Sequence, residues 1–200
     1  MINDCIAFDR KNIDSAVQLF LKKDYNELSL LDVASSLDIK PNELNAEFSN
    51  VGDIVSYCLK FILRDLIGTA LQAVEPNGEF KSILGSMWPS IIQWALLNKN
   101  CFRFYVYMRE QPGFEHAITQ IVDEYMPPLR EHFLNAKLNG NLENVQQKTF
   151  DQINHYHYVS TVEELIGETR KEIIDQHIDQ SFERLWNDLV TSWNTDISDS

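Results

Sequence analysis

Two groups of side chains have types and spacings that allow chemistry. The first is Asn42, Glu43 and Asn45, which lie close together just after Pro41. In the major groove of DNA, asparagine pairs with adenine and glutamate accepts from the amino group of cytosine. The second group is His155-Tyr156-His157, whose imidazoles could bind a metal ion.

The histidine pair does not have the spacing of a metal site. On a helix, positions i and i+2 point apart, so one ion cannot easily take both His155 and His157. Asp151 and His155, at i and i+4, offer two ligands at most. We therefore predict that the protein binds neither a metal ion nor another cofactor.

Sequence signatures of enzymes are missing from the chain. No nucleophile elbow, phosphate-binding loop, dinucleotide fingerprint or HExxH run occurs. The 30 acidic residues are plentiful, but no pattern pairs two of them across a cleft. We therefore expect a protein that is not an enzyme.

The composition bounds the location and the partners. The chain has 200 residues, 44% of them hydrophobic, with a net charge of −13. Such acidity works against phosphate backbones and anionic membranes, although binding depends on the local face. The three cysteines are far apart, and the most apolar stretch is broken by Lys60, Arg64 and Asp65. With Asp4 and Asp9 near the N-terminus, no signal peptide is apparent. The sequence predicts a cytoplasmic protein without a membrane span.

Hydrophobic periodicity and capping residues predict helices throughout the chain. Apolar positions repeat at helical spacing over residues 11–23. Ser29 and Asp32 are close to a capping box for a second short helix, and Pro41 suits the first turn of a third. We expect Asp53 to cap a fourth, longer helix that runs to Val74. Further helices are expected over residues 80–97, 101–109, 114–138, 145–167 and 171–193.

The N-terminal pattern of three short helices and a long one is typical of a helix-turn-helix domain. The residues resemble the TetR family of bacterial regulators. The matching positions are Ile13, Ala16, Leu19, Phe20, Asp24, Tyr25, Ser29, Val33, Ala34, Leu37, Ile39, Leu44 and Phe48.

The resemblance implies an all-α fold of about nine helices. Residues 1–52 would form a helix-turn-helix DNA-binding domain, and residues 53–200 a helical regulatory and dimerisation domain. It also implies a homodimeric, ligand-responsive transcription regulator of the repressor type. The residues expected to contact double-stranded DNA are Arg10, Lys11, Ser29, Lys40, Asn42, Glu43 and Asn45.

The third helix departs from the family in its charge. Glu43 stands where a threonine is typical, Asn45 and Glu47 replace two tyrosines, and Val51 replaces a lysine. Through Asp53 the chain holds five basic and ten acidic residues. The alternative is therefore a TetR-fold interaction protein that has lost DNA binding and faces a protein partner. A further alternative is a binding protein whose pocket is its sole function.

The last helix carries a wide apolar stripe, which must be buried. The resemblance implies a four-helix dimer interface made with the preceding helix, and packing within one chain is the alternative. The proposed interface residues are Ile178, Phe182, Leu185, Trp186, Leu189 and Trp193.

Aromatic side chains are concentrated in the middle of the chain, where the resemblance implies a cavity for a small apolar or amphipathic effector. Simple core packing is the alternative for each of them. The candidate pocket residues are Trp88, Trp94, Phe102, Tyr105, Tyr107 and His116.

Overall fold

A computed structural model describes residues 8–74, 79–111 and 146–195, together with the isolated positions 124, 127, 131, 134 and 135. Every regular element in these residues is helical, which confirms the all-α prediction. The elements are α1 (Arg10–Phe20), a 3₁₀ turn (Tyr25–Glu27), α2 (Leu30–Leu37), α3 (Pro41–Glu47), α4 (Val51–Gln72), α5 (Phe80–Leu97), α6 (Lys99–Arg109), α9 (Gln147–Leu165) and α10 (Lys171–Thr195). The helix expected over residues 114–138 lies outside the described residues, apart from the five isolated positions.

The chain divides into two compact units, each described here by itself. Unit 1 comprises Met1–Asp65 and Asn98–Val122, and unit 2 comprises Leu66–Leu97 and Asp123–Ser200. The division falls inside α4 and places α6 with the N-terminal helices. It therefore does not follow the expected boundary after residue 52, which stays a prediction about the DNA-binding segment.

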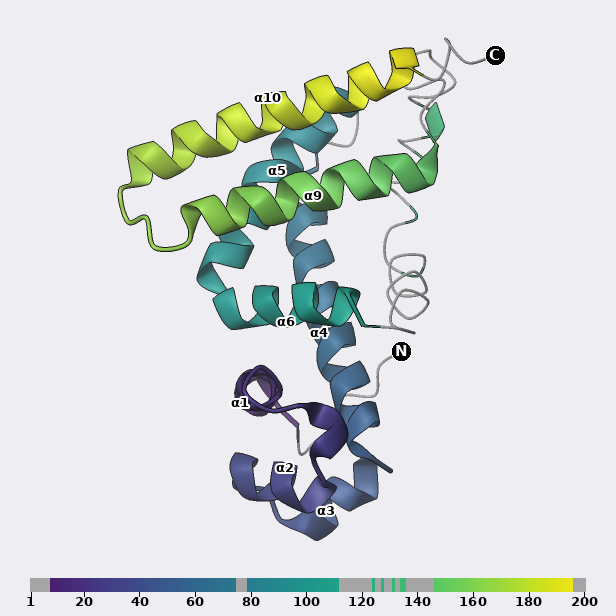
Figure 1. Cartoon of the computed structure of the whole chain (residues 1–200), viewed down its shortest axis with the longest axis vertical. Coiled ribbons are helices and arrows are strands. Elements are labelled where there is room, and N and C mark those ends of the chain that lie inside the picture. The colour runs from purple at the N-terminus through teal and green to yellow at the C-terminus, as the bar shows by residue number, and fades with distance from the viewer. Residues whose placement is uncertain are drawn as a thin grey trace. The chain divides into compact units, whose positions relative to one another are not determined.

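Unit 1 is built around α1, which packs against both α2 and α6, while α2 packs against α3 (Figure 1). Four side chains at helical spacing form the buried face of α1, and none is more than 2% exposed: Ile13, Ala16, Val17 and Phe20. A separate cluster of three aromatic rings in this unit has centroids 5.3 to 5.8 Å apart and consists of Phe8, Phe48 and Tyr57.

The start of α4 differs in detail from the sequence-based expectation. The helix begins at Val51, so Asp53 lies inside its first turn and is not the residue that precedes it. Asn50 Oδ1 accepts from the Asp53 backbone N–H at 3.0 Å, and Asp53 Oδ2 accepts from the backbone N–H groups of Ser49 and Asn50. The two side chains thus cap the helix reciprocally, with Asn50 as the N-cap.

In unit 2, α5, α9 and α10 all contact one another, and α9 and α10 lie side by side (Figure 1). The buried indole of Trp88 in α5 donates from Nε1 to Ser181 Oγ in α10 at 2.8 Å. The Ser181 hydroxyl in turn donates to the Ile178 carbonyl at 2.8 Å. Both buried polar groups are therefore satisfied inside an apolar interface, as buried polar groups must be.

This hydrogen bond gives a test of the packing in unit 2. We expect Ser181→Ala to lower the free energy of unfolding by about 1–3 kcal/mol, because the buried indole N–H loses its acceptor. Trp88→Phe combined with Ser181→Ala should cost less than the sum of the two single changes, because no buried donor is then left over. Urea denaturation of the four proteins measures this, and strict additivity would contradict it.

Candidate nucleic-acid interface

The segment from α2 to α3 forms a helix-turn-helix within unit 1. The α2 helix ends at Leu37, and its C-cap residue Asp38 has left-handed backbone angles (φ 56°, ψ 40°). The Ile39 N–H donates to the Ala34 carbonyl at 3.0 Å. Lys40 is extended and Pro41 opens α3, where its missing N–H costs nothing. Buried Val33 and Leu44 belong to the apolar faces of the two contacting helices.

The α3 helix presents its polar side chains to solvent. Asn42, Glu43 and Asn45 are all exposed, while Leu44 is only 1% exposed. Asn42 and Asn45 share one face, because residues three apart lie on the same side of a helix. The structure thus leaves the three expected base-reading side chains accessible to a ligand.

Lys40 is the only basic residue between the start of α2 and the end of α3, and it pairs with an acidic neighbour. Its Nζ lies 3.2 Å from Glu43 Oε1, and the lysine side chain is 76% exposed. Such an exposed pair is worth at most about 1 kcal/mol, so Lys40 can leave it for a phosphate. Where the pair holds, the positive charge at the start of α3 is offset.

Ser29, a candidate DNA contact, is engaged in starting α2. Its Oγ accepts from the Asp32 backbone N–H at 3.2 Å, and Asp32 Oδ2 accepts from the Ser29 backbone N–H at 2.8 Å. The Ser29 hydroxyl also donates to Asp32 Oδ2 at 2.5 Å. These hydrogen bonds, first that of the hydroxyl, lower the pKa of the Asp32 carboxyl. The capping box expected from the sequence is therefore confirmed.

The two basic candidates in α1 have different surroundings. Lys11 is exposed, whereas the Arg10 guanidinium donates to Asp65 Oδ2 at 2.8 Å and to Asn98 Oδ1 at 2.7 Å. Arg10 is thus held by α4 and by the residue before α6. This placement favours a role inside unit 1 over contact with a phosphate.

The candidate pocket residues that the structure describes are divided between the two units. Trp88 and Trp94 are buried in unit 2, while Phe102 and Tyr105 are buried in unit 1. Tyr107 is partly exposed, and burial together with nearby Asp24 raises its pKa. His116 lies outside the described residues. The buried members lie in the cores of their units, and their contact with an effector stays a prediction.

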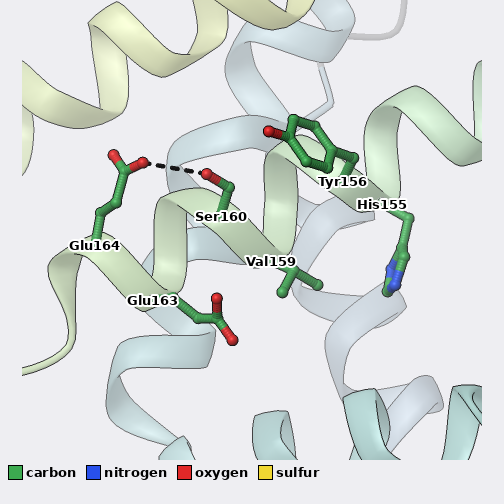
Figure 2. A pocket seen from close by; sticks show the side chains of 6 residues that line it. All are labelled: His155, Tyr156, Val159, Ser160, Glu163 and Glu164. Carbon is green, nitrogen blue, oxygen red and sulfur yellow. Dashed lines mark hydrogen bonds between the residues drawn. The ribbon is translucent and has the colours of Figure 1, made fainter.

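The structure describes a different pocket, on α9. It has a volume of about 620 Å³ and is lined by His155, Tyr156, Val159, Ser160, Glu163 and Glu164. Figure 2 shows Glu164 directed back toward Ser160, whose hydroxyl donates to it at 3.2 Å. Of these positions, His155 was considered from the sequence only as half of a weak metal pair with Asp151. In the part of the chain that the structure describes, no three His, Cys, Asp or Glu residues are grouped as metal ligands.

The expected dimer stripe on α10 is largely used inside unit 2. Ile178, Leu185 and Leu189 are at most 2% exposed, so a partner cannot contact them without repacking. Lys81 of α5 lies 6.0 Å from the ring centroid of Phe182 and 5.6 Å from that of Trp186. A Cβ added at Gly85 would meet the Phe182 ring at 3.1 Å, so α5 covers this ring closely. The side chain of Trp193 lies outside the described residues.

The arrangement of helices matches solved structures of known regulators. A TetR-family transcription regulator from Shewanella sp. PV-4 aligns with 89% of this chain and 95% of its own, at a TM-score of 0.79 and 15% identity. One from Marinobacter aquaeolei VT8 covers 88% and 92% at a TM-score of 0.75 and 13% identity. The TetR-family regulator PfmR from Thermus thermophilus covers 90% and 98% at a TM-score of 0.61 and 17% identity.

The chain has the TetR fold. No protein-family model and no curated protein sequence matches it. At this level of identity the likeness establishes the architecture alone, and that architecture is the one the sequence predicted. Among the described residues, no helix is long and apolar enough to cross a membrane.

The capping box of α2 gives a second test. We expect Ser29→Ala to destabilise the protein by about 1 kcal/mol, because an N-cap is lost. The matched control is Ser35→Ala in the same helix, where alanine has the better helix propensity and stability should not fall. Thermal or urea denaturation of the two variants distinguishes them, and equal effects would contradict the role of the cap.

The same carboxylate predicts how stability depends on pH. The folded pKa of Asp32 is lowered, so its contribution is complete above the unfolded value of about 3.9. That contribution is lost as the pH falls through the folded value. Asp32→Asn should therefore lose stability at neutral pH and show a smaller further loss on acidification than the unaltered protein. Denaturation curves between neutral and acid pH measure this difference.

Proposed function

We propose that this protein is a homodimeric DNA-binding transcription regulator of the repressor type that responds to a small apolar or amphipathic ligand. The observation that carries the proposal is the solvent-facing α3 of a helix-turn-helix, in a chain that shares its fold with TetR-family regulators over about nine-tenths of its length. In this mode the second helix of the motif enters the major groove and its side chains contact base edges.

The charge of the head determines how it would bind DNA. Residues 8–53 hold five basic and nine acidic side chains, and one of the basic ones, Arg10, is held by Asp65 and Asn98. Phosphate contacts then fall to Lys11, Lys22, Lys23 and Lys40, all of them exposed. Since each phosphate contact contributes to the salt dependence, a head with few of them binds with a shallow slope.

Specificity in this proposal comes from uncharged side chains. Asn42 and Asn45 lie on one exposed face of α3 and have the amide geometry that pairs with adenine. Glu43 accepts from cytosine when it is not paired with Lys40. Ser29 is left out of the base-reading set because its hydroxyl is used in the capping box.

The dimer in this proposal forms along the outward faces of α9 and α10. The buried residues of α10 face the core of unit 2, so the contact falls on the pocket side of α9, where Tyr156 is 68% exposed. Residues 147–195 hold nine acidic and four basic side chains. Pairing two such surfaces brings like charges together, so added salt should strengthen the dimer by screening them.

The effector is proposed to act by population shift. A ligand that binds one quaternary arrangement of the dimer more tightly than the other changes the spacing of its two reading heads, which are residues 8–53 of each protomer. The affinity for DNA changes with that spacing. The aromatic side chains of α5 and α6 are consistent with an apolar or amphipathic ligand.

A second candidate is an interaction protein that keeps the fold but binds a cationic protein surface. The pairing of Lys40 with Glu43 favours it, because Asp38, Glu43 and Glu47 then leave the end of the head acidic. Such a surface attracts basic partners and repels phosphates. The two candidates differ in one measurable property, which is binding to DNA at low salt.

DNA binding is tested on fragments from the region upstream of the gene, with salt varied. We expect Asn45→Ala to weaken specific binding about 5- to 150-fold, corresponding to 1–3 kcal/mol, with an unchanged salt slope. Lys23→Ala should weaken all sequences and reduce the slope by about one. Lys171→Ala in α10 is the matched control for loss of a positive charge and should do neither.

Two outcomes of this experiment decide between the candidates. Specific binding with a shallow slope supports the regulator. Absence of binding at low salt, by a folded dimer both with and without candidate effectors, rejects the regulator for that DNA. Retention of a basic protein by the same preparation, lost in Glu47→Gln, would then support the interaction protein.

The dimer is tested by sedimentation. We expect Tyr156→Asp to raise the dissociation constant of the dimer at least tenfold, because an exposed aromatic anchor is replaced by a further negative charge. Glu172→Gln, an exposed position on α10, removes a negative charge and should not weaken the dimer. A Tyr156→Asp protein that dimerises like the unaltered one would place the interface elsewhere.

A further inference from the structure

A single guanidinium joins three segments of unit 1. Arg10, in the first turn of α1, donates from Nη1 to Asp65 Oδ2 in α4 at 2.8 Å and from Nη2 to Asn98 Oδ1 at 2.7 Å. Its Nε lies 3.4 Å from Asp14 Oδ1, and its Cζ lies 5.3 Å from the ring centroid of Phe61. The planar fork of arginine is suited to this, since it binds acceptors in two directions at fixed geometry.

The two acceptors occupy particular places in the chain. Asp65 is the last residue of unit 1 on α4, and Asn98 is the residue at which the chain re-enters unit 1 before α6. Arg10 therefore binds the chain at both of its passages out of and back into unit 1. The partners are 55 and 88 residues away in sequence, so the contacts are entirely tertiary.

Asn98 binds Arg10 and does not cap α6 with its side chain. It is the N-cap residue of α6, but its side chain makes no capping hydrogen bond. An asparagine in that position ordinarily accepts from a backbone N–H of the first turn. Here its side-chain oxygen accepts from Arg10, so the first turn of α6 lacks a side-chain cap while α1 gains an anchor.

Further contacts join α1 to α6 along the same line. The Cys101 thiol, in α6, lies 3.7 Å from Asp14 Oδ1, and burial followed by the nearby carboxylate of Asp14 raises the pKa of this thiol to about 11. It therefore stays a neutral donor. At the other end of α1, the rings of Phe20 and Phe104 have centroids 6.1 Å apart. The α1 helix is thus attached to α6 at both ends.

We propose that Arg10 is a positioning residue of the reading head, which sets how α1, and with it α2 and α3, is held on α4 and α6. The proposal rests on the proposed DNA-binding function, for which α3 must be presented at a fixed orientation. It replaces the expectation that Arg10 contacts a phosphate. A change in α4 or α6 reaches the reading helices through this guanidinium.

The decisive variant is Arg10→Lys, because it keeps the charge and loses the fork. A lysine could still hold a phosphate but cannot bind Asp65 and Asn98 together. We expect Arg10→Lys to weaken specific DNA binding about tenfold with an unchanged salt slope, consistent with loss of a charge-assisted hydrogen bond. Asn98→Ala should weaken binding similarly, and the double variant little more than either single one.

Lys11→Met is the matched control, since it removes an exposed charge from the neighbouring position of α1. It should lower the salt slope of DNA binding. It should leave unchanged the non-additivity between Arg10→Lys and Asn98→Ala. DNA binding is measured well below the melting temperature of each variant, so that lost stability alone does not lower affinity. Full binding by Arg10→Lys, or additive losses in the double variant, would overturn the proposal in favour of phosphate contact or independent effects.

Amide hydrogen exchange gives a readout that needs no DNA. We expect Arg10→Lys and Asn98→Ala to accelerate exchange in α1 and in the first turn of α6 together, while α9 and α10 keep their rates. Lys11→Met should leave all four helices unchanged. If the unaltered protein binds no DNA but exchange rises in both helices of the variants, the proposed function fails while the positioning role of Arg10 is supported. If exchange in α1 and α6 of the variants is unchanged, the positioning role of Arg10 is rejected.

Discussion

The helix-turn-helix of α2 and α3 depends on the burial of α1. Helices of eight and seven residues, such as α2 and α3, are too short to be stable alone in water, so tertiary packing must hold them. The apolar face of α1 supplies that packing on one side and lies against α6 on the other. The orientation of α3 therefore depends on its contact with α2 and, through α2, on the packing of α1.

The acidity of the head constrains how it can recognise a ligand. With one cation held by Asp65 and another paired with Glu43, little positive charge is left for a phosphate backbone. Under the proposed function, affinity for DNA would come from well-placed base contacts, and these depend on orientation more than long-range attraction does. The proposed function therefore requires that α3 be held more firmly here than in a strongly basic helix-turn-helix.

Local features were predictable from the sequence, and long-range ones were not. Periodicity and caps predicted most helices, including the Ser29–Asp32 box, because these patterns act within a few residues. The cap of α4 was misplaced, because Asn50 and Asp53 are both acceptable caps by type. Periodicity predicted the apolar face of α10 but not that α5 and α9 pack against this helix. Leu185 was therefore expected in a dimer interface and lies in the core of unit 2. The contacts of Arg10 with Asp65 and Asn98 leave no local pattern at all.

The two units differ in how deeply their polar contacts are buried. In unit 2, the Trp88–Ser181 hydrogen bond is buried and satisfied, which fixes one packing of α5 on α10. In unit 1, the Arg10 contacts are only part-buried, with side chains about 40% exposed, so water competes for each of them. The contacts of Arg10 can therefore be broken at modest cost in free energy, whereas breaking the buried Trp88–Ser181 hydrogen bond costs more. The more adjustable set of contacts is the one that joins α1 to α4 and to the residue before α6.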